Sequence, residues 1–259
     1  MLRAAIFDFG NTLIGLDPTK ASARTDYADV VARPGSERLA RHLAQKGILS
    51  PEAAGEEFVA RLLEIRERNR LTADQTGREI DATTSLAEAL DDAGVRVPPP
   101  AGLRAALRAY FAYEESCLVA LPGAVKSLAF LRKRGIALAL LSNATDGPFV
   151  ARVAKRMKMR RFFEPFVVSA DIGVRKPRAE AFRAALADWS LPAGAVAMIG
   201  DSLFHDIDGA NRLGLYSIHI TMVPNPADPS HQKRIKPRLS VASHEALREH
   251  VEPLLSKEP

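Results

Sequence analysis

Five short apolar runs, most of them separated by helical patterns, constrain the fold of this chain more than any other feature. The runs cover residues 4–7, 137–141, 166–168, 196–199 and 217–220. Helical patterns lie between the last four runs and after the fifth, over 147–159, 179–188, 207–213 and 244–255. Buried strands that alternate with helices form parallel sheets covered on both faces. The sequence therefore predicts an α/β fold with a doubly wound, Rossmann-like parallel sheet.

The long segment between the first two runs shows no strand pattern. It contains helical stretches near 36–45, 51–68, 78–93 and 101–114. Ser50 and Pro51 are residue types that serve as N-cap and first helical position, so they predict a helix start. We expect an inserted α-helical domain over 17–117, with the α/β domain formed by 1–16 and 118–259.

Composition limits the setting in which the chain works. Cys117 is the only cysteine among the 259 residues, which excludes an intramolecular disulfide and makes a reducing cytoplasm the simplest location. No apolar stretch approaches the roughly 20 residues that span a bilayer. The apolar start is too short for the core of a signal peptide and meets an acid at Asp8. We therefore expect no membrane partner.

The formal net charge of +5 suits an anionic partner, either a small substrate or a nucleic acid. Six basic residues and no acid lie within 152–161, but Val150, Val153 and Met157 recur among them at helical spacing. This pattern favours the solvated face of an amphipathic helix over a nucleic-acid surface. A second basic run, 233–238, is also interpreted as solvated surface. We expect a small anionic substrate, and the sequence leaves the oligomeric state open.

Acidic residues follow two of the predicted strands. Asp8 comes after the first run and Asp201 after the run at 196–199, and ligands of open parallel sheets bind at these strand ends. Two hard carboxylate ligands suit Mg²⁺, which would also relieve their mutual repulsion. Asp206 lies at the expected start of the next helix, where capping is its simplest role. Gly10 predicts a tight turn that brings the backbone close to a ligand.

Two further residues, one at a strand end and one in a loop, carry polar or charged groups that could act at the same site. Ser142 ends the second run, and its hydroxyl could bond a phosphoryl oxygen or form a cap or turn; both interpretations stay open. Lys176 precedes Pro177, which predicts a helix start, although a single lysine is most often a surface residue.

Taken together, the segments 6–13, 141–144, 175–177 and 200–210 resemble the four motifs of the haloacid-dehalogenase superfamily, in the family's order. The resemblance covers the core from residue 1 to about 222. The helical insertion after the first motif is similar to the family's helical cap of the first type, and Leu121-Pro122-Gly123-Ala124 resembles the usual return to the core.

This resemblance implies a Mg²⁺-dependent phosphatase that acts on a small phosphate ester. Asp8 would be the nucleophile, and Lys176 would neutralise charge on it and on the phosphate. The same resemblance implies a phosphate site and a metal site. Phosphate would be bound by Asn11, Ser142, Asn143 and Lys176. Mg²⁺ would be held by Asp8, the backbone carbonyl of Gly10 and Asp201, with Asp206 supporting the metal's waters or Lys176.

The chain departs from the family's phosphatases at Gly10, where they usually carry a second aspartate that acts as general acid and base. Glycine also occurs there in some family phosphatases. Another residue, a group of the cap or water must then supply the proton. His205 and Asp206 are candidates only by their proximity, and a solvated loop position is the plainer interpretation of His205.

Three other functions compete with a phosphatase. A 2-haloacid dehalogenase also lacks the second aspartate, but it needs no metal and usually carries tyrosine there, whereas this chain retains Asp201 and Asp206. A phosphonate hydrolase would need a Schiff-base lysine, for which Lys20 and Lys46 are candidates. A binding protein on a disabled scaffold is the third alternative.

No motif in the expected cap domain names the substrate. Three arginines could contact an anionic group, although surface positions on helices are the plainer interpretation: Arg24, Arg33 and Arg41.

Overall fold

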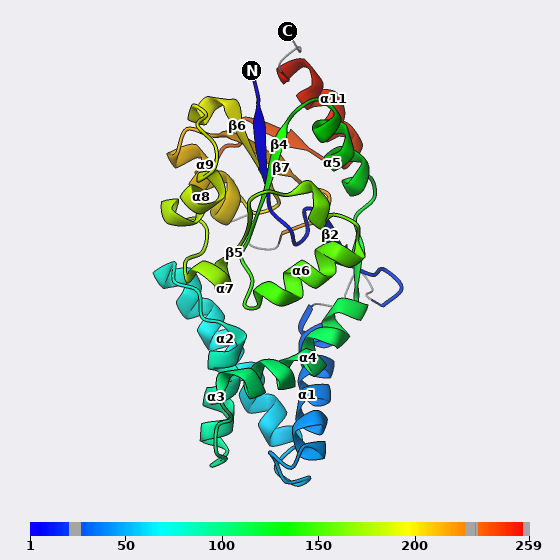
Figure 1. Cartoon of the computed structure of the whole chain (residues 1–259), viewed down its shortest axis with the longest axis vertical. Helices are drawn as coiled ribbons and strands as arrows, with labels where there is room; N and C mark the ends of the chain where they lie inside the picture. The colour runs from blue at the N-terminus through cyan, green and yellow to red at the C-terminus, as the bar shows by residue number, and fades with distance from the viewer. Residues whose placement is uncertain (21–26, 226–230, 232, 256–259) are drawn as a thin grey trace. The chain divides into compact units, whose positions relative to one another are not determined.

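The computed structural model describes residues 1–20, 27–225, 231 and 233–255. The chain divides into two units (Figure 1). Unit 1 contains Met1–Gly15 and Val119–Pro259, and unit 2 contains Leu16–Leu118. Among the described residues, no helix is long and apolar enough to cross a membrane.

Unit 1 is built on a six-stranded parallel sheet with the order β5-β4-β1-β6-β7-β8. The strands are β1 (Ala4–Phe7), β4 (Ala137–Ser142), β5 (Phe166–Val168), β6 (Val196–Gly200), β7 (Tyr216–Ile220) and β8 (Leu239–Val241). The predicted α/β fold and parallel sheet are confirmed. All five predicted runs form strands, whereas β8 was not predicted.

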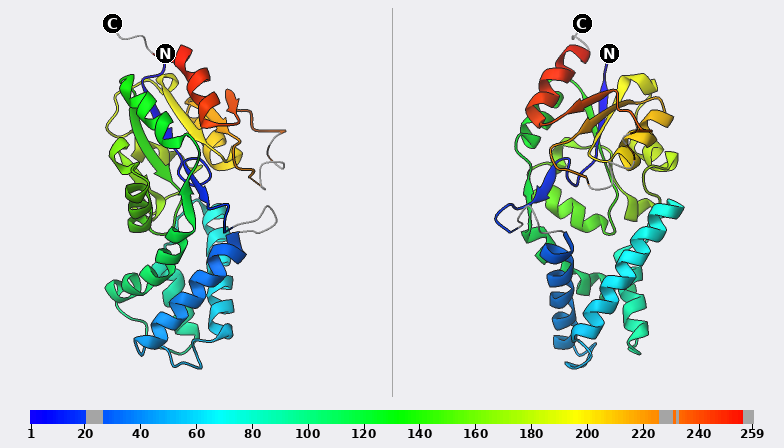
Figure 2. Two further views of the ribbon diagram at one scale, coloured as in Figure 1. Left: turned by 90° about the vertical axis from the view of Figure 1, so that its right-hand side faces the viewer. Right: turned by 180° about the vertical axis from the view of Figure 1, so that it is seen from behind.

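Helices cover both faces of this sheet. The α-helices of unit 1 are α5 (Ala124–Lys133), α6 (Gly147–Arg156), α7 (Ser169–Ile172), α8 (Ala179–Leu186), α9 (Gly209–Arg212) and α11 (His244–Val251). Figures 1 and 2 show α8 and α9 on one side of the sheet and α5 and α11 on the other. Ile6 and Met198 pack against Phe182 of α8 in one apolar cluster, because alternate strand residues point to the same face. These layers leave the carboxyl ends of the strands as the edge where loops can form a site.

Helix α6 carries much of the first basic run on its exposed side. Arg152 and Lys155 are exposed, whereas Val150 and Val153 are buried against unit 1. The solvated face of an amphipathic helix, as predicted, therefore accounts for these charges.

Unit 2 is helical. Its elements are η1 (Ala28–Ala32), α1 (Arg33–Gln45), α2 (Glu56–Thr76), α3 (Ala82–Asp92) and α4 (Pro100–Ser116). The expected helix start at Pro51 is wrong, because α2 begins at Glu56 with Gly55 as its N-cap. The Ser50 hydroxyl instead accepts a hydrogen bond from Ala53 N at 3.1 Å and closes a separate turn.

Two short strands also lie in the segment where none was expected. β2 (Ile14–Leu16) and β3 (Leu118–Ala120) pair in a two-stranded sheet where the chain passes between the units. Three residues are too few to produce a recognisable period in the sequence.

Candidate active site

Asp8 and Asp201 follow two neighbouring strands of the unit 1 sheet. β1 pairs with β6, with Phe7 opposite Ile199, and Asp8 N donates to Ile199 O at 2.9 Å. The chain leaves β1 toward β4 and leaves β6 toward β7, so the two aspartates flank the point where the strand order reverses. This is the position where ligands bind in open α/β sheets. Both aspartates are buried.

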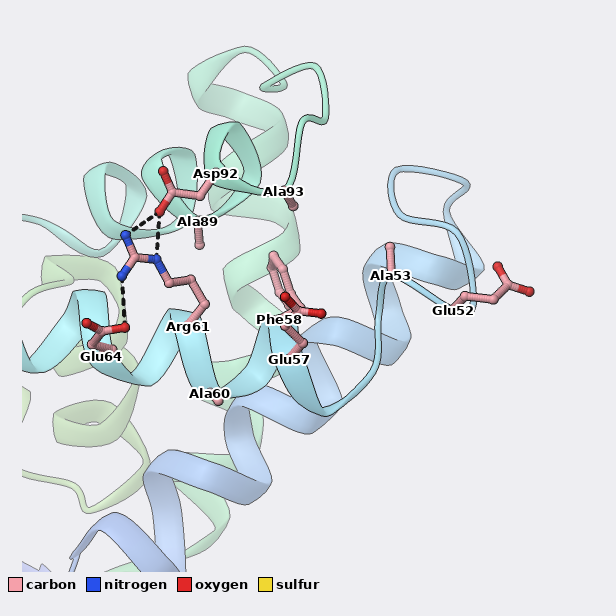
Figure 3. A pocket seen from close by; sticks show the side chains of 10 residues that line it. All are labelled: Glu52, Ala53, Glu57, Phe58, Ala60, Arg61, Glu64, Ala89, Asp92 and Ala93. Atoms are coloured by element: carbon pink, nitrogen blue, oxygen red, sulfur yellow. Dashed lines mark hydrogen bonds and ion pairs between the residues drawn. The ribbon is translucent and has the colours of Figure 1, made fainter.

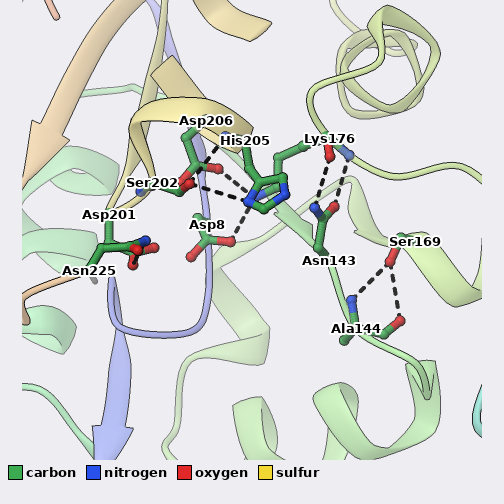
Figure 4. Close-up of polar contacts among 10 residues, drawn as sticks. All are labelled: Asp8, Asn143, Ala144, Ser169, Lys176, Asp201, Ser202, His205, Asp206 and Asn225. Carbon is green, nitrogen blue, oxygen red and sulfur yellow. Dashed lines mark hydrogen bonds and ion pairs between the residues drawn. The ribbon is translucent and has the colours of Figure 1, made fainter. Parts of the chain in front are cut away.

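Lys176 joins two of the acidic residues inside unit 1 (Figure 4). Its Nζ lies 2.6 Å from Asp8 Oδ1 and 2.7 Å from Asp206 Oδ1, and the side chain is 1% exposed. Burial alone would lower the pKa of Lys176, but the negative charges of Asp206 and Asp8 outweigh burial and raise it. Lys176 is therefore a charged ammonium group beside Asp8 rather than the surface lysine that is common elsewhere.

Asp206 is held by the turn that follows β6, which continues as the π-helix η4 (Leu203–Asp208). Its Oδ2 accepts a hydrogen bond from Ser202 N at 3.0 Å. A Cβ at Gly200 would lie 2.2 Å from this Oδ2, so the close approach of Asp206 to the strand end requires glycine there. The Ser202 hydroxyl caps η4 by accepting from His205 N at 3.1 Å and lies 3.2 Å from His205 Nδ1.

The three carboxylates have the composition of a divalent cation site. Asp8, Asp201 and Asp206 each offer an oxygen, and these atoms lie within 4.8 Å of one another. Burial, together with the charges of Asp8 and Asp206, raises the pKa of Asp201 to about 8. Three carboxylates face one ammonium group, so two negative charges stay unbalanced within this cluster when all are ionised. A hard divalent cation with oxygen ligands fits this excess.

Ser142 and Asn143 lie at the end of β4, the strand on the other side of β1. Ser142 is the last residue of β4 and is buried. The Asn143 amide contacts the backbone of Lys176, accepting from its N at 2.9 Å and donating to its O at 3.0 Å. Asn143 therefore positions Lys176, and binding of phosphate by its side chain stays a prediction.

A tight turn follows Asp8, and Gly10 is not its left-handed residue. A Cβ at Gly10 would meet no atom within 4 Å, and the left-handed residue of the turn is Asn11, with φ 52°. Thr12 N donates to Gly10 O at 2.6 Å. This hydrogen bond closes the tight turn that was predicted, but Asn11 rather than Gly10 adopts the left-handed conformation, which asparagine tolerates.

Two residues that sequence reasoning missed contact Asp201. His219 Nε2 lies 2.9 Å from the Asp201 backbone O, and Asn225 Nδ2 donates to Asp201 Oδ2 at 3.2 Å. A histidine inside the apolar run of β7 was the one available signal, because a buried polar side chain needs a partner. The sequence offered no such signal for Asn225.

Comparison with known proteins identifies the family. The profile of the haloacid dehalogenase-like hydrolases matches residues 2–214. The chain belongs to this hydrolase family. It is 28% identical over 221 residues to the glyceraldehyde 3-phosphate phosphatase of Pyrococcus abyssi, covering 84% of this chain and 81% of the relative. It is 30% identical over 142 residues to the phosphoserine phosphatase of Thermus thermophilus, covering 55% of each chain.

A solved structure shows the same fold. The 2-haloacid dehalogenase from Pseudomonas syringae pv. Tomato DC3000 superposes with a TM-score of 0.70 at 22% identity, covering 98% of this chain and 100% of that one. At this identity the likeness concerns the fold, and the activity must be argued from the site.

Unit 2 of the hydrolase contains a surface hollow of about 730 Å³ (Figure 3). It is lined by Glu52, Ala53, Glu57, Phe58, Ala60, Arg61, Glu64, Ala89, Asp92 and Ala93. Arg61 pairs there with Glu64 at 2.8 Å and with Asp92 at 2.7 Å. None of the predicted site residues lines this hollow, so the candidate active site is defined by the polar cluster of unit 1.

Unit 2 contains the arginines expected to contact an anionic substrate and the lysines considered for a Schiff base. Those that the structure describes are exposed or contact other residues of unit 2. Arg33 pairs with Glu56 at 2.6 Å, and Arg41 is exposed. Arg24 lies outside the described residues. Lys20 Nζ donates to Ser116 O at 2.7 Å, and Lys46 is exposed at the end of α1.

Proposed function

We propose that this hydrolase is a Mg²⁺-dependent phosphatase that acts on a small phosphorylated metabolite through Asp8. The observation that carries the proposal is the buried cluster in which Lys176 contacts Asp8 while Asp201 and Asp206 supply further oxygens. The relatives from Pyrococcus abyssi and Thermus thermophilus, which are named as phosphatases, support the same activity. A cytoplasmic location belongs to this proposal.

The proposed chemistry has two steps. An Asp8 carboxylate oxygen attacks phosphorus in line with the leaving oxygen, so the ester P–O bond breaks and an acyl phosphate forms on Asp8. Water then attacks this phosphorus, which releases inorganic phosphate and regenerates the carboxylate. Lys176 neutralises charge on Asp8 and on the phosphoryl oxygens. Asn11, Ser142 and Asn143 are the proposed partners of the remaining oxygens.

Asp8, the Gly10 carbonyl and Asp201 are the proposed Mg²⁺ ligands, with Asp206 holding Lys176 and the metal's waters. Bound Mg²⁺ would supply electrostatic stabilisation of the phosphoryl oxygens.

The leaving oxygen also needs a proton, which an aspartate at position 10 would normally supply. Asp206 is 1% exposed, and its carboxylate contacts Lys176 and Ser202 N. His205 is partly exposed on the same turn. We therefore propose that water protonates the leaving oxygen, and of the two side chains His205 is the one to test as an alternative donor.

Unit 2 is proposed to act as the cap domain that selects the substrate. Substitutions within its expected limits of 17–117 should therefore change the substrate preference. Arg33 and Arg41 are the first positions to test among the residues that the structure describes.

The rival functions receive less support. A 2-haloacid dehalogenase needs no metal, whereas Asp8, Asp201 and Asp206 together offer the oxygens of a cation site here. A Schiff-base role for Lys20 has no support from its contacts, which are with Ser116. A binding protein would have no need for Lys176 buried against Asp8.

A paired substrate screen tests the proposal. We expect inorganic phosphate release from members of a panel of phosphate esters, including glyceraldehyde 3-phosphate and phosphoserine, when Mg²⁺ is present. Halide release from 2-chloropropionate should stay at background. Robust halide release without phosphate release would replace the phosphatase by a dehalogenase, and inactivity toward both panels would favour the binding protein.

A further inference from the structure

A buried hydrogen bond links the turn after Asp8 to the last helix of unit 1. His244 Nε2 lies 2.8 Å from Thr12 O, and both residues are 0% exposed. Because a carbonyl oxygen only accepts, Nε2 must carry the hydrogen. Nδ1 has no hydrogen-bond partner among the residues that the structure describes, so a neutral ring fits this environment. Burial lowers the pKa of His244, in agreement with a neutral ring.

His244 is itself fixed by the start of α5. Its backbone O accepts from Ser127 Oγ and from Arg248 Nη1, each at 3.0 Å. Gly123, with φ +82°, approaches so closely that an added Cβ would lie 3.0 Å from His244 Cβ. The imidazole therefore reaches Thr12 from a rigid base formed by α5 and α11.

The turn that receives this hydrogen bond is tight and contains a residue in the left-handed region. Thr12 N donates to Gly10 O across Asn11, which closes a three-residue turn, and Asn11 has a left-handed φ of 52°. Conformations of this kind cost free energy and persist only where the surrounding structure holds them. His244 contacts the carbonyl of Thr12, the last residue of this turn, and is therefore placed to hold it.

We propose that His244 is a positioning residue for the metal site. It fixes Thr12, which in turn orients the Gly10 carbonyl through the Thr12 N–H. A carbonyl oxygen has a second lone pair, so Gly10 O can accept from Thr12 and also face a cation. The inference rests on the proposed function, in which Gly10 O is a Mg²⁺ ligand. His244 does not touch substrate or metal and acts only through this turn.

The test is calorimetric titration of the full chain with Mg²⁺ alone, without substrate. His244→Leu removes the donor and should weaken Mg²⁺ binding about tenfold, the size of one lost buried hydrogen bond. His244→Gln places an amide N–H near the position of Nε2 and should stay within about threefold of the wild type. Leu247→Ala is the matched control, because Leu247 is buried on the same helix; it should lower stability with unchanged Mg²⁺ affinity.

Wild-type Mg²⁺ affinity in His244→Leu, or equal weakening in Leu247→Ala, would overturn the inference. If His244→Leu does not fold, His244→Asn replaces it, because the asparagine amide ends near Nδ1 and falls short of Thr12. Equal Mg²⁺ affinities in His244→Asn and His244→Gln would then contradict the positioning role of His244. Mg²⁺ binding without phosphatase activity contradicts the proposed function alone, whereas a wild type that binds no Mg²⁺ contradicts both.

Discussion

Gly10 has open space at the position of a Cβ. A Cβ there meets no atom within 4 Å, so Gly10→Asp should fold normally. General acid assistance is worth about 10²–10⁴-fold, and its absence should fall hardest on poor leaving groups. We expect wild-type rates to rise steeply as the leaving-group pKa falls, and Gly10→Asp to reduce this dependence. A series of aryl and alkyl phosphates, measured with chemistry rate-limiting, provides the comparison.

The same series of phosphate esters tests whether His205 donates the proton to the leaving oxygen. A wild-type rate that does not vary with the leaving group would mean that a residue already donates the proton. His205→Ala should then introduce the steep dependence, and a series that stays flat in this variant would exclude His205 as the donor.

His244 gives a prediction about stability and pH. Burial lowers its pKa, the Thr12 carbonyl opposes this shift and the charge of Arg248 adds to it. Below the ordinary pKa of 6.5 the unfolded chain therefore binds a proton that the folded chain does not. The free energy of unfolding should be unaffected above pH 6.5 and should fall below it, by at most about 1.4 kcal/mol per pH unit.

His244→Gln lacks this titration and retains a hydrogen-bond donor. Urea unfolding of both proteins between about pH 5 and pH 8 measures the difference, because the other titrating groups are common to both. Parallel stability curves for the two proteins would show that His244 does not remain neutral on folding.

At the scale of elements, the end of β6 must be a glycine. Gly200→Ala would place a methyl group 2.2 Å from Asp206 Oδ2, which must then move away from its contacts with Lys176 and Ser202. A displacement of this size in a catalytic cluster costs roughly 100-fold in turnover. Gly194→Ala is the matched control, since its Cβ meets nothing within 4 Å. Phosphatase assays of both variants should show the loss only in Gly200→Ala. Equal turnover in the two variants would contradict the claim that Asp206 requires glycine at position 200.

The sequence predicted helices and strands well where the helical spacing of apolar residues, or a continuous apolar run, was long enough to recognise. β1 and β6 follow from continuous apolar runs, and their parallel pairing brings Asp8 and Asp201 together. β8, with the sequence Leu-Ser-Val, is a short edge strand with one fully buried residue, so it leaves no apolar run to recognise.

Long-range contacts escaped prediction for a different reason. Asn143 and Lys176 are 33 residues apart, and Thr12 and His244 are 232 residues apart. No local pattern encodes such pairs, because they exist only after the layers of the sheet and helices have packed. Sequence reasoning therefore named Asn143 and the charged groups of the candidate site, but it missed the contact of Asn143 with Lys176 and the contact of His244 with Thr12.

At the scale of the whole molecule, the candidate site depends on segments from the whole length of unit 1. Asp8, Lys176 and Asp206 are far apart in the sequence and meet because their loops leave the same edge of one sheet. Their association requires unit 1 to be folded, so loss of activity in any variant must be compared with the fraction that remains folded.

The most direct test of the account is the Mg²⁺ dependence of p-nitrophenyl phosphate hydrolysis by the wild type and by Asp8→Asn. This leaving group needs little protonation, so the nucleophile and the metal site should suffice despite Gly10. The account predicts that wild-type turnover saturates with Mg²⁺ and falls to background in excess chelator. Asp8→Asn, shown to be folded by circular dichroism, should remain at background at every Mg²⁺ concentration. Full wild-type activity in chelator, or undiminished turnover by Asp8→Asn, would contradict it.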